Sequence, residues 1–170
     1  MKDLIKDIVI ALVIVLVITA VVKPTIVKEH SMEPTLYENN YLLINKLAYK
    51  TGDEEKGDII VFKSSLQDES GNSKLLIKRI IGLPGDKVTV KDGNVFINGI
   101  QLHEDYLNDG ITTGEVIDYT VPENHFFVMG DNRLVSIDSR DPSVGCVHED
   151  AILGKAFVRL YPFSEIGGLY

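Results

Sequence analysis

The sequence predicts a mainly β protein with one membrane-spanning helix at its N-terminus. Residues 8–22 carry no charged side chain and a single hydroxyl group, that of Thr19. From Pro24 onward, short runs of β-branched and aromatic residues alternate with turn residues. No window in this part of the sequence has the apolar period of a helix. Many short strands separated by turns are typical of a β barrel or a β sandwich.

The apolar segment at residues 8–22 is shorter than the ~20 residues that cross a bilayer core as a helix. Lys6 and Lys23 can extend their amines toward water, and apolar residues beyond both lysines lengthen the segment. A cleaved signal peptide would need small residues at a cleavage site, and residues 19–24 contain no such pattern. A buried core helix would need other helices to pack on. We therefore interpret the segment as an uncleaved anchor.

We therefore expect two parts: residues 1–23, which hold the cytoplasmic N-terminal end and the anchor, and residues 24–170, which form a β domain outside the cytoplasm. Two lysines flank each end of the apolar segment, so the positive charges do not set its orientation. The short N-terminal flank favours a cytoplasmic N-terminus. We therefore expect a single-pass protein of the cell membrane, in contact with the lipid bilayer.

Composition limits the classes of function. A net charge of −8 over 170 residues argues against nucleic acid as the main partner, because contacts to phosphate require a basic surface. The single cysteine, Cys146, excludes a disulfide within the chain. The four histidines are scattered without the spacing of metal ligands. We expect neither a metal nor a cofactor.

Three apolar runs have the length and composition of strands: residues 41–44, 58–62 and 126–129. A hairpin is predicted around Asp92-Gly93, and Asn98-Gly99 then reverses the chain again. The polar stretch at residues 64–74 predicts an exposed loop. Residues 87–125, which lie between two stretches rich in motifs, predict an inserted β subdomain.

A lysine within an apolar strand is the first indication of chemistry. At the two-residue period of a strand, Leu76 and Ile80 share a face with Lys78. Burial disfavours the charged amine, so the pKa of Lys78 should fall from ~10.4 toward neutrality. Such a lysine can act as a general base if a nucleophile is near, and Ser31 offers one. Two simpler interpretations remain open: Lys78 can extend its amine to water, and Ser31 can open a turn.

Four segments carry a resemblance to a known family: residues 31–36, 57–61, 78–86 and 130–140. In this order behind an anchor, they resemble the bacterial type I signal peptidases, membrane-bound serine proteases that remove signal peptides from exported preproteins. The resemblance covers essentially the whole chain. It implies a β domain of the signal peptidase and self-cleaving repressor type, and the signal peptides of preproteins as partners.

The resemblance also implies residue roles. Ser31 would be the nucleophile and Lys78 the general base. Ser136 would help to orient the lysine amine. The supporting ion pairs that the resemblance implies are Arg79 with Asp131 and Arg140 with Asp138. A neutral amine has one lone pair with which to accept the serine proton, so its orientation must be fixed.

Two departures from the family pattern stand out. Glu29 occupies a position where some members have a hydroxyl that donates to the oxyanion, and an ionised carboxylate cannot donate. Leu134 and Val135 replace a stretch that is usually polar, which indicates altered contacts on the substrate side and a specialised relative, for example one dedicated to pilus or other surface proteins.

Two other interpretations compete with the membrane protease. Self-cleaving repressors share the Ser–Lys β architecture but need a DNA-binding module, where this acidic chain has a hydrophobic segment. A catalytically weak or inactive anchored relative could serve as an adaptor in surface-protein assembly. The presence of both Ser31 and Lys78 argues against an adaptor, and Glu29 argues for it.

Overall fold

The computed structural model describes residues 2–50, 54–107 and 111–169. Its elements in chain order are α1 (Lys2–Val21), β1 (Val22–Ile26), β2 (Tyr41–Asn45), β3 (Ile59–Gln67), β4 (Ser73–Gly82), β5 (Lys87–Lys91), β6 (Asn94–Ile97), β7 (Ile100–Gln101), β8 (Val116–Thr120), β9 (His125–Met129), β10 (Val147–His148), the short 3-10 helix η1 (Glu149–Ala151), β11 (Ile152–Tyr161), the 3-10 helix η2 (Phe163–Glu165) and β12 (Gly167–Gly168). The prediction of a mainly β protein with one N-terminal apolar helix is confirmed.

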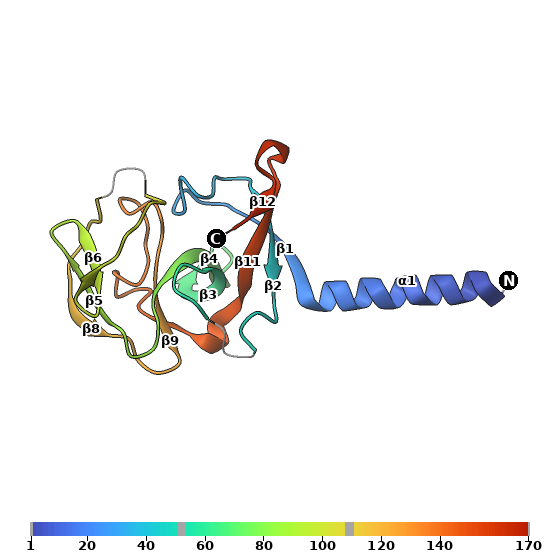
Figure 1. The fold of residues 1–170 in the computed structure, drawn as a ribbon, viewed down its shortest axis with the longest axis horizontal. Coiled ribbons are helices and arrows are strands. Elements are labelled where there is room, and N and C mark those ends of the chain that lie inside the picture. Colours follow the sequence, from blue (N-terminus) through green and yellow to red (C-terminus); the bar gives the residue numbers. More distant parts are fainter. Residues whose placement is uncertain (1, 51–53, 108–110, 170) are drawn as a thin grey trace.

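Helix α1 projects away from the β domain, as Figure 1 shows, and none of its residues is buried. Its 20 residues span about 30 Å at 1.5 Å per residue, which matches the hydrocarbon core of a bilayer. The helix is also apolar enough to cross a membrane. It ends at Val21, and the residues that follow form β1, which pairs with β2. Pro24, which has no N–H to donate, lies on this edge strand.

Two sheets form the β domain. The larger sheet has the order β1-β2-β11-β3-β4-β9-β10, with β12 paired to β11. The second sheet, in the order β7-β6-β5-β8, draws all four strands from within residues 87–125. Its two tight turns contain Asp92 and Asn98 at φ 51° and 54°, as two-residue hairpin loops require.

The prediction of a loop over residues 64–74 was wrong. Strand β3 continues to Gln67 and β4 begins at Ser73, so the connection between them is only residues 68–72. Polar residues extend the strand because the alternation of burial continues through them: Ser64 is buried, while Lys63 and Ser65 are exposed. The Ser64 hydroxyl donates to the Lys74 carbonyl at 2.9 Å, which satisfies a buried polar group across the strand pair.

Three apolar clusters hold the segments that carry the candidate site. One contains Val27, Met32 and Leu36, and packs the chain after β1 against Leu42 and Ile59 of the larger sheet. The other two contain side chains of both β4 and β9, and one of them also joins the second sheet to these strands. Each fully buried aliphatic side chain contributes roughly 1.5–3 kcal/mol to folding. The core therefore fixes β4, the end of β9 and the segment after β1 relative to one another.

Candidate active site

Ser31 lies in a tight turn that follows β1. The side chains of Met32 and Leu36 anchor this turn in the core, and the Leu36 N–H donates to the Met32 carbonyl at 2.8 Å. The Asn132 N–H donates to the Ser31 carbonyl at 3.0 Å, which ties the turn to the chain beyond β9. A Cβ on Gly130 would lie 2.3 Å from that carbonyl oxygen, so this close approach has no room for a side chain. Ser31 is thus fixed from two sides.

Lys78 lies in the middle of β4 with 1% of its surface exposed. Its Nζ lies 2.6 Å from Ser31 Oγ, within hydrogen-bond distance. Burial lowers the pKa of Lys78 to about 8; the carboxylates of Asp138 and Glu29 oppose this shift. The structure therefore places the predicted base beside the predicted nucleophile, with an amine that loses its proton far more readily than a lysine in water.

The Arg79 side chain leaves β4 on the opposite face from Lys78 and meets Asp131 in a buried, two-pronged ion pair. Its Nε and Nη2 donate to the two Asp131 carboxylate oxygens at 2.9 and 2.7 Å. Thr35, from the turn that carries Ser31, donates to the same carboxylate at 2.5 Å. This pair joins β4, the chain after β9 and the Ser31 turn.

A second ion pair, between Asp138 and Arg140, closes the loop after β9. Arg140 donates to both carboxylate oxygens at 2.9 and 2.8 Å, and the Gly130 N–H donates to one of them at 2.9 Å. Burial opposes ionisation of Asp138, but the hydrogen bond and the charge of Arg140 outweigh it and lower the pKa of that carboxyl. The loop is therefore held in one shape by charge-assisted hydrogen bonds.

The predicted helper residue, Ser136, does not hydrogen-bond to Lys78 in this structure. Its Oγ is buried and has no hydrogen-bond partner of normal geometry among the described residues, although it lies close enough to Asp138 to favour the ionised carboxylate. The Oγ lies 2.3 Å from the place where a Cβ on Gly130 would be, the same distance as the Ser31 carbonyl oxygen. Ser136 is therefore close to the turn that carries the nucleophile.

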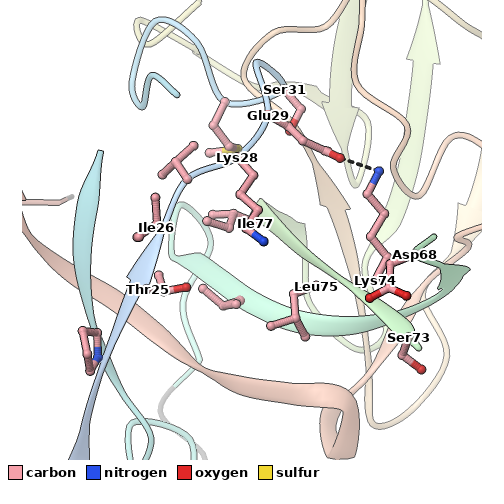
Figure 2. Close-up of a pocket in the computed structure, with 14 residues that line it drawn as sticks. Thr25, Ile26, Lys28, Glu29, Ser31, Asp68, Ser73, Lys74, Leu75 and Ile77 are labelled. Atoms are coloured by element: carbon pink, nitrogen blue, oxygen red, sulfur yellow. Dashed lines mark ion pairs between the residues drawn. The ribbon is translucent and has the colours of Figure 1, made fainter. Parts of the chain in front are cut away.

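A groove of about 520 Å³ opens beside Ser31, between two walls that Figure 2 shows. One wall is β1 with its continuation as far as Met32, and the other is the first half of β4. Within the described residues, β1 pairs only with β2, and residues 73–77 of β4 pair only with β3. Both walls therefore carry a strand edge that can pair with an extended peptide.

Several residues at the site were not predicted from the sequence. The Tyr106 ring lies 4.1 Å from the Arg79 guanidinium, and the Tyr106 hydroxyl donates to Glu104 at 2.6 Å. Glu104 forms a buried ion pair with Arg133, whose Nε donates to the Gly130 carbonyl at 3.0 Å. No local pattern marks Tyr106 or Glu104 as part of the site, because Arg79 and Arg133, which connect them to it, lie more than 20 residues away in the sequence.

The departures from the family pattern occupy different places. Glu29 lines the groove and forms an ion pair with Lys74 of β4. Leu134 and Val135 are exposed on the loop after β9 and do not line the groove. Glu29 is therefore the departure that lies in the groove beside Ser31.

Comparison with known proteins identifies relatives of this chain. The profile of the family described as "Signal peptidase, peptidase S26" matches residues 1–161. Signal peptidase IB of Staphylococcus aureus is 39% identical over 161 residues, which cover 85% of this chain and 80% of the relative. A probable signal peptidase I-2 of Synechocystis sp. is 41% identical over 145 residues, covering 83% and 64%. The crystal structure of a signal peptidase I from Enterococcus faecalis V583 aligns with a TM-score of 0.50 and 34% identity, covering 61% of this chain and 96% of that one.

The Arg79–Asp131 pair predicts a large effect on stability. Asp131→Asn removes the carboxylate and leaves the Arg79 charge buried, so unfolding should become easier by about 3 kcal/mol or more. Urea unfolding of the full chain in detergent measures this change. The exposed lysine Lys91 provides a control, since Lys91→Ala should change stability by less than about 0.5 kcal/mol. Equal stability of the two variants would contradict the structural role of the pair.

Proposed function

Because the chain belongs to the signal peptidase S26 family and is a serine protease of the type I signal peptidase class, we propose that it removes signal peptides from exported preproteins with a Ser31–Lys78 dyad. One observation carries the dyad: Lys78 Nζ lies 2.6 Å from Ser31 Oγ, and both side chains are buried. A nucleophile and its base must lie within this distance for proton transfer.

The neutral amine of Lys78 accepts the proton of Ser31 while Oγ attacks the scissile carbonyl. The resulting ammonium then delivers this proton to the leaving amine, and an acyl-enzyme remains. Water attacks the acyl group with Lys78 again as base, which releases the signal peptide and restores Ser31. With a pKa of about 8, roughly one Lys78 in ten is neutral at pH 7, so the base form is available without further activation.

Negative charge develops on the carbonyl oxygen of the substrate during attack. Among the described residues, no group accepts a hydrogen bond from the Ser31 backbone N–H, and this donor can stabilise the oxyanion. Glu29 is held by Lys74 and has no proton to donate when ionised. We assign the oxyanion donor to the Ser31 N–H, together with water from the groove.

The remaining predicted residues act as positioning residues in this proposal. The Arg79–Asp131 and Arg140–Asp138 pairs fix the strand that carries Lys78 and the loop that carries Ser136. The buried Ser136 hydroxyl, which lacks a partner of normal geometry, is available to orient the amine when Lys78 is neutral. Its role is to hold the lone pair toward Ser31.

The groove accounts for an extended substrate. A peptide between β1 and β4 can pair with either strand edge, which holds its backbone in a fixed register beside Ser31. Small residues at the first and third positions before the cut are expected from the family. Specialisation for pilus or other surface proteins stays a prediction, since Leu134 and Val135 lie outside the groove.

We place helix α1 in the bilayer with its N-terminal end toward the cytoplasm. Residues 1–23 then form the cytoplasmic end and the membrane anchor, and residues 24–170 lie outside the cytoplasm. Ser31 follows the helix end at Val21 by 10 residues, so the active site lies near the membrane surface, where a signal peptide ends its own span. Protease treatment of intact spheroplasts should then digest the β domain. Complete protection of that domain, with an accessible N-terminus, would reverse this topology.

Loss of either dyad residue should abolish cleavage. Ser31→Ala and Lys78→Ala should each lower the cleavage rate of a labelled preprotein by at least about 10³-fold, because nucleophile and base act as one unit. Matched controls are Ser70→Ala and Lys63→Ala, exposed residues outside the groove, which should keep the full rate. Circular dichroism verifies that each variant is folded. Comparable turnover by a folded Ser31→Ala or Lys78→Ala variant would exclude the dyad.

The pH dependence of cleavage should report the Lys78 amine. Since the base form is required, kcat/KM should rise with pH and then level off, and the midpoint of this rise should lie near the pKa of about 8. Glu29→Gln should lower this midpoint, because the Glu29 charge raises the pKa of Lys78, and Lys74→Gln should raise it. Lys78→Arg should be inactive, since a guanidinium does not deprotonate in this range. A rate that is independent of pH between 6 and 10 would contradict a lysine base.

A further inference from the structure

An ion pair bridges the two walls of the groove beside Ser31. Glu29 projects from the wall formed by the chain after β1, and Lys74 projects from β4, as Figure 2 shows. Both side chains are about 40% exposed, at 41% and 40%, so the bridge lies at the mouth of the groove and not on its floor. An extended peptide that runs along the groove must therefore pass the line between these two groups.

The bridge is close to the reacting atoms on both walls. Glu29 precedes Ser31 by two residues, and Lys74 precedes Lys78 by four residues on the same face of β4. The charges of Glu29 and Lys74 both reach Lys78. Two other charged residues line the groove, and neither bridges it: Lys28 is exposed, and an Asp68 carboxylate oxygen accepts N–H groups of its own turn at 2.9 Å.

We propose that Glu29 and Lys74 are specificity-determining residues, which read the charge of the preprotein side chain presented at the mouth of the groove. This inference rests on the proposed function, because it needs a preprotein bound in the groove. A basic substrate side chain takes Glu29 as its partner, and an acidic one takes Lys74. An apolar substrate side chain separates Glu29 from Lys74 and offers neither of them a new charged partner.

The geometry of an extended peptide selects the substrate position. Successive side chains of a strand point to opposite faces. The residue directly before the scissile bond faces the wall at Ser31, so the second residue before the bond faces the mouth of the groove, where Glu29 and Lys74 meet. The fourth residue before the bond shares this face, one step farther from Ser31.

The exposure of the bridge suits a contact that opens at every turnover. Half-exposed ion pairs contribute little to stability, because water and salt screen their charges. Opening the bridge therefore costs little free energy. The preference for one substrate charge over the other should be a few-fold difference in rate rather than an absolute one. Such a preference ranks substrates without excluding any of them.

The test compares two peptides that differ only in the second residue before the cut, lysine in one and glutamate in the other. The quantity measured is the ratio of kcat/KM for the lysine peptide to that for the glutamate peptide. Both peptides are cleaved by the same dyad, so any change in the pKa of Lys78 cancels in this ratio. The ratio therefore reports recognition alone.

Lys74→Glu should raise this ratio at least about threefold, because two carboxylates then face the substrate side chain. Glu29→Lys should lower it by a similar factor. The double variant Glu29→Lys with Lys74→Glu restores a bridge of reversed polarity and should bring the ratio back toward the parent value. Lys91→Glu and Glu123→Lys, exposed residues outside the groove, change the net charge equally and should leave the ratio unchanged.

The outcomes separate this inference from the proposed function. If the unaltered chain cleaves neither peptide, the proposed function fails and this inference fails with it. If it cleaves both, the proposed function stands. Ratios that stay equal in the parent, Lys74→Glu and Glu29→Lys would then overturn the specificity role, as would equal changes in the two control variants.

Discussion

The burial of one lysine amine is the constraint on which the structure of the site depends. Lys78 is 1% exposed, and burial lowers its pKa from 10.5 to about 8. Between these values the unfolded chain binds more protons than the folded one, so this group's stability contribution falls as pH falls from 10.5 to 8. At neutral pH the penalty is about 3 kcal/mol, which the surrounding apolar core must offset. The same penalty makes the amine a usable base.

Three arginines hold in place the strand and the loop that surround Lys78. They keep their positive charge, whereas the Lys78 amine must lose its charge to act as a base. Arg79 joins β4 to Asp131. Arg140 pairs with Asp138, whose carboxylate also accepts a hydrogen bond from the Gly130 N–H. Arg133 ties the same loop to Glu104, which lies between β7 and β8 of the second sheet. A guanidinium stays protonated and offers several fixed donors. These arginine contacts therefore hold the strand and the loop in place around Lys78.

Local patterns in the sequence predicted those parts of the fold and the site that depend on interactions between residues close together in the sequence. The apolar helix, the hairpin turn at Asp92 and the strand around Lys78 all follow from periodicity and turn chemistry. The extension of β3 through Ser64 was missed, because a polar residue can continue a strand when its partner lies across the pair. The Glu29–Lys74 bridge and the Tyr106 contact were missed for a related reason. Their partners meet only after distant segments have packed.

A titration of the Lys78 amine itself tests this account most directly. The protein would be labelled with ¹³C at lysine Cε and followed by NMR in detergent from neutral to strongly alkaline pH, with the Lys78 resonance assigned by its absence in Lys78→Met. The account predicts a midpoint near 8 for this resonance. A midpoint near the ordinary value of 10.5 would mean that the amine is charged throughout the working range, and the general-base role would be contradicted.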